Sequence, residues 1–135
     1  MTMRALVLVL TLFLAAPANA APPRDLMERA IVFVAGELGT PIPRARPIVI
    51  MTDGCGLQWA GKRWPCWTRF TRLRIVAAQR GEKLYFHRSW RFRTVEQQCV
   101  YAHEMAHWMR LKFGGQTSET EARRVERACV RAGGL

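Results

Sequence analysis

The stretch Cys99-Val100-Tyr101-Ala102-His103-Glu104-Met105-Ala106-His107-Trp108 is the most informative part of the chain. It contains the pattern His103-Glu104-x-x-His107. On an α-helix, residues four apart lie on one face, so both imidazoles can reach one metal ion. The glutamate that follows the first histidine can then meet a water molecule at that metal. The pattern predicts a helix that holds one zinc ion through His103 and His107, with Glu104 as the general base.

The residues on either side indicate where this helix begins and ends. Thr94 followed three residues later by Gln97 is typical of a capping box, and Gly114-Gly115 is typical of a helix end. Apolar residues recur between these limits at helical spacing, which predicts one face in the core. The residues expected on that face are Cys99, Ala102, Ala106, Met109 and Phe113.

The first twenty residues have the pattern of a secretory signal peptide. Arg4 precedes the apolar run 5–16, and Ala18-Asn19-Ala20 matches the small-x-small cleavage site. The run is too short for a comfortable membrane span. Removal of residues 1–20 from a chain of 135 leaves 115 residues, enough for a single small domain at 21–135. We therefore expect an exported protein, periplasmic or secreted, that is a monomer and not an integral membrane protein after cleavage.

The expected export indicates that the four cysteines form disulfides. An oxidising compartment and an even number of cysteines favour two disulfides, and four cysteines allow three pairings. We favour Cys55–Cys66, which closes a short loop, and Cys99–Cys129, which links the last helix to the histidine helix. The chain has no Cys-x-x-Cys pair, so a zinc site built from cysteines is disfavoured.

The protein is basic, with a formal net charge of +11, one unit of which is Arg4 in the leader. Such a charge attracts the protein to anionic surfaces, such as those of the envelope. The alternative is that the charge only keeps the protein soluble and has no specific partner. No nucleic-acid motif or clustered basic helix is present, so specific nucleic-acid binding is not expected. One hypothesis of function follows from the basic surface and the tryptophans. In it the chain is a non-catalytic binding module for anionic envelope polymers or an acidic partner, and any metal is structural or absent.

Hydrophobic periodicity predicts an α+β domain with a short three-stranded sheet. Trp59, Trp64 and Trp67 lie in its least regular part, where they either form a lid or substrate platform or fill the core. The expected elements are a helix at 25–38, a strand at 47–52, a hairpin with strands 73–78 and 83–87 around 79–82, the histidine helix, and a last helix at 118–132.

A catalytic zinc site needs a third protein ligand, and the last helix offers Glu119, Glu121 and Glu126. A Cys99–Cys129 bond between antiparallel helices would set Glu126 near Ala102, leaning toward the level of the histidines, while Glu119 would lean away. Glu121 is already explained as part of a capping box that starts at Ser118. This geometry favours Glu126, with Glu119 as the alternative and Glu121 less favoured.

The pattern His103-Glu104-Met105-Ala106-His107, followed by a glutamate on the next helix, resembles the gluzincin branch of zinc metallopeptidases. The layout also resembles small secreted bacterial zincin-like proteins of uncharacterised families. In many of these the third ligand opens a Glu-x-x-Ala pattern, which here is Glu119-Thr120-Glu121-Ala122, so the resemblance points to Glu119. It implies a minimal zincin-like domain in which the histidine helix packs on a C-terminal helix.

The implied activity is zinc-dependent hydrolysis of a peptide or amide bond in the bacterial envelope. Glu104 would take a proton from the attacking water and pass it to the leaving amine. The strand 84–87 is a candidate edge for holding an extended peptide substrate. Tyr85, His87 and Tyr101 are candidates for stabilising the oxyanion or contacting the substrate.

Overall fold

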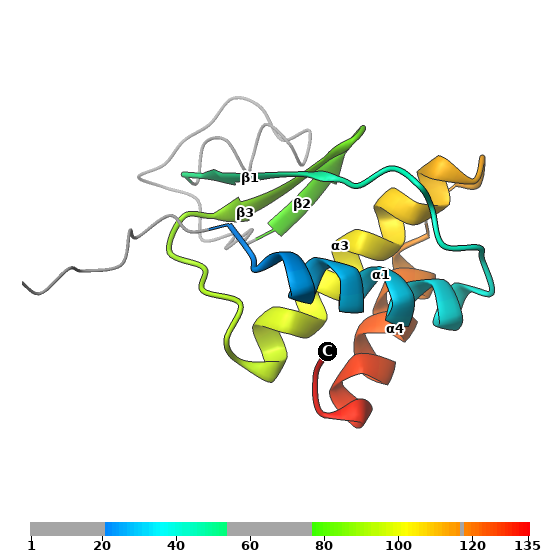
Figure 1. Cartoon of the computed structure of the whole chain (residues 1–135). Coiled ribbons are helices and arrows are strands. Elements are labelled where there is room, and N and C mark those ends of the chain that lie inside the picture. The colour runs from blue at the N-terminus through cyan, green and yellow to red at the C-terminus, as the bar shows by residue number, and fades with distance from the viewer. Residues whose placement is uncertain (1–20, 54–76, 117) are drawn as a thin grey trace, which may run out of the picture.

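The computed structural model describes residues 21–53, 77–116 and 118–135. It has an α+β architecture, in the order expected from the sequence. Several predictions fall outside the described residues: the signal peptide at 1–20, the Cys55–Cys66 disulfide, the role of the tryptophan-rich segment and the strand residues 73–76. The elements are α1 (Arg24–Leu38), β1 (Ile48–Thr52), β2 (Ala77–Arg80), β3 (Lys83–His87), α3 (Val95–Lys112) and α4 (Glu119–Ala132) (Figure 1).

The sheet is mixed, with the order β1-β3-β2. β3 runs parallel to β1 and antiparallel to β2. Because β3 is the central strand, both of its edges are already hydrogen-bonded. The expectation that 84–87 offers a free edge to a peptide is therefore wrong.

The hairpin between β2 and β3 has a tighter turn than the sequence suggested. Arg80 pairs with Lys83, so only Gly81 and Glu82 form the turn, and Gln79 belongs to β2. Gly81 has φ 57°, a left-handed conformation that two-residue hairpin turns need and that glycine adopts without a steric penalty. The position of this glycine, more than the polar run around it, determines where the chain reverses.

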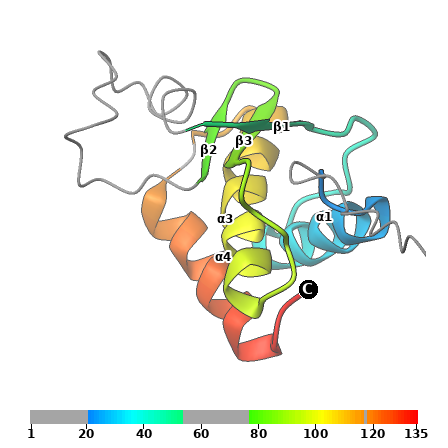
Figure 2. The ribbon, with the colours of Figure 1, turned by 90° about the vertical axis from the view of Figure 1, so that its left-hand side faces the viewer.

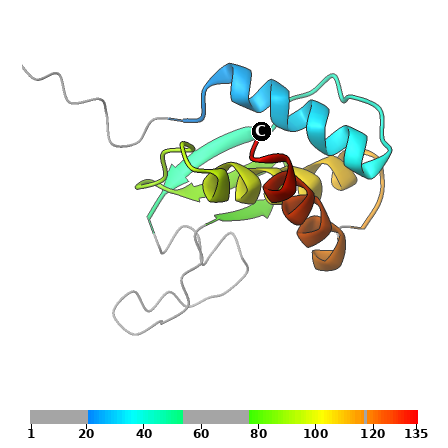
Figure 3. The same ribbon diagram turned by 90° about the horizontal axis from the view of Figure 1, so that it is seen from below.

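The three helices lie on one face of the sheet, with α3 between α1 and α4 (Figures 2 and 3). Every residue of α3 from Tyr101 to Met109 is buried, because the sheet, α1 and α4 surround this helix on several sides. The expected apolar face is correct except for Phe113, which is 42% exposed beyond the last turn. Among the described residues, no helix is both long enough and apolar enough to cross a membrane.

Side-chain caps fix the starts of the two helices that carry the candidate ligands. Thr94 Oγ accepts a hydrogen bond from the Gln97 amide at 3.1 Å, and Ser118 Oγ accepts one from the Glu121 amide at 3.0 Å. The Gln97 side chain accepts from the Arg93 amide instead of the Thr94 amide, so the capping box closes one residue early. The Ser118 cap makes Glu119 the first residue of α4.

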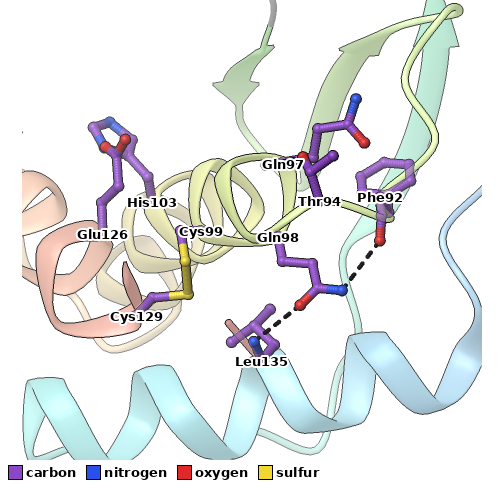
Figure 4. Close-up of a disulfide and its surroundings, with 9 residues drawn as sticks. All are labelled: Phe92, Thr94, Gln97, Gln98, Cys99, His103, Glu126, Cys129 and Leu135. Atoms are coloured by element: carbon purple, nitrogen blue, oxygen red, sulfur yellow. Dashed lines mark hydrogen bonds and ion pairs between the residues drawn. A yellow bond between two sulfur atoms is a disulfide. The ribbon is translucent and has the colours of Figure 1, made fainter. Parts of the chain in front are cut away.

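A disulfide joins α3 to α4. Cys99 and Cys129 are bonded with their Cα atoms 5.4 Å apart, and Figure 4 shows the bond beside the side chains of His103 and Glu126. Closing a loop with a sequence separation of 30 stabilises the fold by roughly 3–4 kcal/mol in the chain-entropy account. Cys99 is one helical turn before His103, so the bond holds α4 against the helix that carries the histidines.

Candidate metal centre

Three side chains converge on one point between α3 and the start of α4. His103 Nε2 and His107 Nε2 lie 3.3 Å apart. The Glu119 carboxylate faces both, with Oε2 3.3 Å from His103 Nε2 and Oε1 2.8 Å from His107 Nε2. These three residues form a group that could hold a metal ion.

The separations fit a tetrahedral ion. Two ligand atoms bound at about 2.0–2.1 Å in a tetrahedron lie about 3.3 Å from each other. The two Nε2 atoms have this separation. The Glu119 carboxylate meets them through different oxygens, with Oε2 at 3.3 Å from His103 Nε2 and Oε1 at 2.8 Å from His107 Nε2, and one donor atom from each residue lies within 4.8 Å of the others. The Glu119 side chain is 64% exposed, so its carboxylate has room to reorient toward an ion. Among the described residues, the group supplies three donors, two imidazole nitrogens and a carboxylate oxygen, of types that zinc accepts.

Glu126 contacts the same histidine on its other edge. Its Oε2 lies 2.8 Å from His103 Nδ1 (Figure 4). A carboxylate beside Nδ1 accepts a hydrogen bond from the ring N–H at that position. The other ring nitrogen, Nε2, then carries the lone pair, which is directed toward Glu119 and His107. Glu126 therefore lies where it would orient His103, and the group of described residues that could hold a metal does not include it.

The possible metal group contains Glu119, the alternative third ligand, and not Glu126, the favoured one; the assignment of the third ligand stays a prediction. Glu126 lies beside His103, as the pairing of Cys99 with Cys129 predicted. The position of a carboxylate along the helix axis does not determine which edge of the imidazole it meets. Glu119 was expected to lean away, yet its three rotatable side-chain bonds carry the carboxylate back to His107. The spacing of seven residues puts Glu119 and Glu126 on one face of α4, which was the available signal that both act on His103.

Glu121 belongs to a structural ion pair. Arg110 grips both of its oxygens, at 2.6 and 2.8 Å, and also reaches the Leu38 carbonyl at 3.4 Å. The hydrogen bonds from Arg110 lower the pKa of Glu121 below its usual value. The pair ties the first turn of α4 to the last turn of α3, and so it supports the position of Glu119.

Glu104 is buried next to the centre and 8% exposed. It has no hydrogen-bond or ion-pair partner among the described residues. Burial, followed by the negative charges of Glu119 and Glu126, raises its pKa to about 8. A buried carboxylate that has no partner among the described residues is costly for folding, and a pKa raised in this way is typical of functional sites.

The histidines suit metal binding because the metal-binding form of imidazole is neutral. Burial, the largest cause, and the neighbouring His103 lower the pKa of His107 below its usual value, although Glu119 and Glu121 act in the opposite direction. Burial therefore favours the neutral ring, whose lone pair is available to a metal near neutral pH.

The residues expected near the oxyanion do not join this centre. Tyr101 is fully buried and packs against Phe86 and Phe92, with ring centroids 5.5 and 5.4 Å away. Tyr85 alternates with residues that face the helices, so it points to the other side of the sheet. His87 Nδ1 lies 2.7 Å from Ser89 Oγ. These three candidates came from residue type alone, and the strand and helix periods turn them elsewhere.

The raised pKa of Glu104 predicts a pH effect on the metal-free chain. In the folded state its pKa is about 8, above the ordinary value of 4.5. The stabilisation from the protonated carboxyl is then full below about pH 4.5 and is lost as the pH rises through 8, by roughly 5 kcal/mol in all. Urea unfolding of chelator-treated protein should show Glu104→Gln gaining on the wild type between pH 5 and pH 8.5. Parallel pH profiles for the two proteins would contradict the burial of an unpaired carboxyl.

No protein-family profile, curated protein or solved structure matches the chain. The evidence on function is therefore the chemistry of the candidate metal centre.

Proposed function

We propose that this protein is a zinc-dependent metallopeptidase-like hydrolase that cleaves peptide or amide bonds. His103, His107 and Glu119 hold the ion, Glu126 orients His103, and Glu104 acts as the general base. The observation that carries the proposal is the convergence of three zinc-type donor atoms beside a buried carboxylate that has no partner among the described residues.

The chemistry divides between the ion and the side chains. When bound, zinc lowers the pKa of a coordinated water and polarises the substrate carbonyl. Glu104 accepts the proton of the attacking water and returns it to the leaving nitrogen, which restores the resting state. Glu126 keeps the proton of His103 on Nδ1, so that Nε2 remains a ligand throughout.

Two features favour this proposal over the non-catalytic binding module. A structural zinc site is normally closed by four protein ligands, whereas the group formed by the described residues has three. A binding module also has no use for Glu104, whose burial destabilises the fold. The basic surface on which the module hypothesis rests is compatible with either function.

Metal analysis of the purified, exported protein tests the proposal. We expect about one zinc per chain in the wild type and none in His107→Ala, because two ligands without the third bind weakly. Arg131→Gln, an exposed change on α4, should keep its zinc and serves as the matched control. Absence of zinc from the wild type, even after reconstitution with excess zinc, would contradict the proposal.

A further inference from the structure

A groove of about 480 Å³ extends from the metal centre along α4. Its lining combines metal-centre residues with one exposed face of the helix, because positions 119, 123, 126, 127 and 130 lie at helical spacing. The lining residues are His103, Glu119, Arg123, Glu126, Arg127 and Val130.

The acidic and the basic side chains of this groove differ in how many contacts they make with other described residues. Both carboxylates are directed at histidines, Glu119 at the metal group and Glu126 at His103 Nδ1. Arg123 is 68% exposed, and its one ion pair with another described residue is a long contact, 3.8 Å, with Glu119. The structure gives Arg127 no hydrogen bond or ion pair to another described residue. Two guanidinium groups therefore remain available to a ligand.

Metal binding would make the net charge of this groove positive. In the metal-free groove the two arginines balance the two glutamates. A divalent ion adds two positive charges, and the groove stays positive even when Glu104 beside it is ionised. Planar guanidinium groups bind carboxylates through paired, charge-assisted hydrogen bonds, which gives them a preferred ligand.

The spacing along the helix locates the anionic group on a substrate. Arg123 and Arg127 follow Glu119 by four and eight residues, which corresponds to about 6 and 12 Å along the axis of α4. An extended peptide advances about 3.3 Å per residue. A carboxylate two to four residues from the bond at the metal would reach these arginines.

We propose that the substrates are acidic peptides, with an aspartate or glutamate two to four residues from the scissile bond held by Arg123 and Arg127. The inference rests on the proposed function, since it takes the metal centre as the place of cleavage. It assigns a specificity role to two arginines that touch the substrate and take no part in the chemistry.

Peptide binding to the zinc-loaded Glu104→Gln protein tests the proposal without turnover. Fluorescently labelled peptides would carry a single aspartate, or asparagine in its place, at successive positions, and anisotropy would give their affinities. We expect the aspartate peptide to bind roughly 3- to 10-fold tighter per arginine engaged, at positions two to four residues from the bond. Arg123→Gln and Arg127→Gln should each remove that preference in part and the double variant should abolish it, while 0.5 M salt should reduce it.

Arg131→Gln is the matched control, because it removes the same charge from the same helix outside the groove. Equal affinities for aspartate and asparagine peptides would overturn the inference. An equal loss in Arg131→Gln would also overturn it, since it would indicate diffuse attraction to a basic surface and hence to polyanions.

Hydrolysis by the wild type separates this inference from the proposed function. Cleavage of a mixed peptide pool without preference for acidic residues would overturn the inference and leave the hydrolase intact. Retained preference in binding, with no cleavage of any peptide, would support the groove as an acidic-peptide site and contradict the hydrolase. All the exchanged arginines are exposed, so these variants should fold as the wild type does.

Discussion

Glu104→Gln is expected to keep its zinc and to lose hydrolysis by about 10²- to 10⁴-fold, the usual contribution of a positioned general base. Glutamine has nearly the same shape as glutamate and cannot accept the proton of the attacking water. It also carries no charge, so it removes the cost of burying an ionised carboxylate. The variant should therefore be at least as stable as the wild type, which separates a chemical defect from a folding defect.

The measurements are zinc content, thermal unfolding and kcat on one cleaved peptide for both proteins. Glu96→Gln provides the control, since Glu96 is exposed in the first turn of the same helix. A Glu104→Gln protein that holds zinc and retains full activity would exclude Glu104 as the base. Loss of zinc together with activity would instead show that Glu104 supports the metal.

The helices and their boundaries could be predicted because their signals are local. Thr94 and Ser118 cap their helices through their own hydroxyl groups, and the observed caps agree with the sequence pattern. The spacing of His103 and His107 is likewise a local property of a helix. The Cys99–Cys129 pair, in contrast, is a long-range contact, which the sequence favours only if the last two helices pack side by side. The structure places the two sulfur atoms together.

The remaining features depend on contacts that a single sequence does not encode locally. The sequence of α3 does not reveal that α1, α4 and the sheet would bury it on several sides, because its buried residues include polar ones such as His103 and Glu104. Strand order is also a long-range property, and it made β3 central instead of an edge. The choice between Glu119 and Glu126 also lies beyond the sequence, since it depends on which edge of the His103 imidazole each carboxylate meets.

The centre depends on α4 being held firmly against α3, and the chain supplies ties at both ends of the contact. Arg110 and Glu121 link the helices near Glu119, and the disulfide links them just beyond Glu126. A small domain has little buried area with which to fix a helix, so such cross-links substitute for a large core. His103, Glu104 and His107 lie between the two ties on α3, Glu126 lies between them on α4, and Glu119 lies two residues before Glu121.

Glu119→Gln is expected to weaken zinc binding more than Glu126→Gln does. Zinc binding free energies of about 10–16 kcal/mol shared among four ligands assign roughly 2.5–4 kcal/mol to each, or about 10²- to 10³-fold in affinity for a lost ligand. Loss of a carboxylate that only orients a histidine costs about 10- to 100-fold. Competition with a chromophoric chelator gives both constants, with Glu96→Gln as the control that should bind as the wild type does.

Because these ranges meet near 100-fold, the coordination itself must be measured. Cobalt(II) in place of zinc reports the number and type of ligands through its visible absorption, since geometry and donor set determine the bands. Glu119 Oε1 and Oε2 face both histidine Nε2 atoms, whereas Glu126 meets only Nδ1 of His103. Glu119→Gln should therefore change the cobalt spectrum, while Glu126→Gln should lower the affinity and leave the bands in place. The reverse result would make Glu126 the ligand and would require α4 to rotate or slide against α3 when the metal binds.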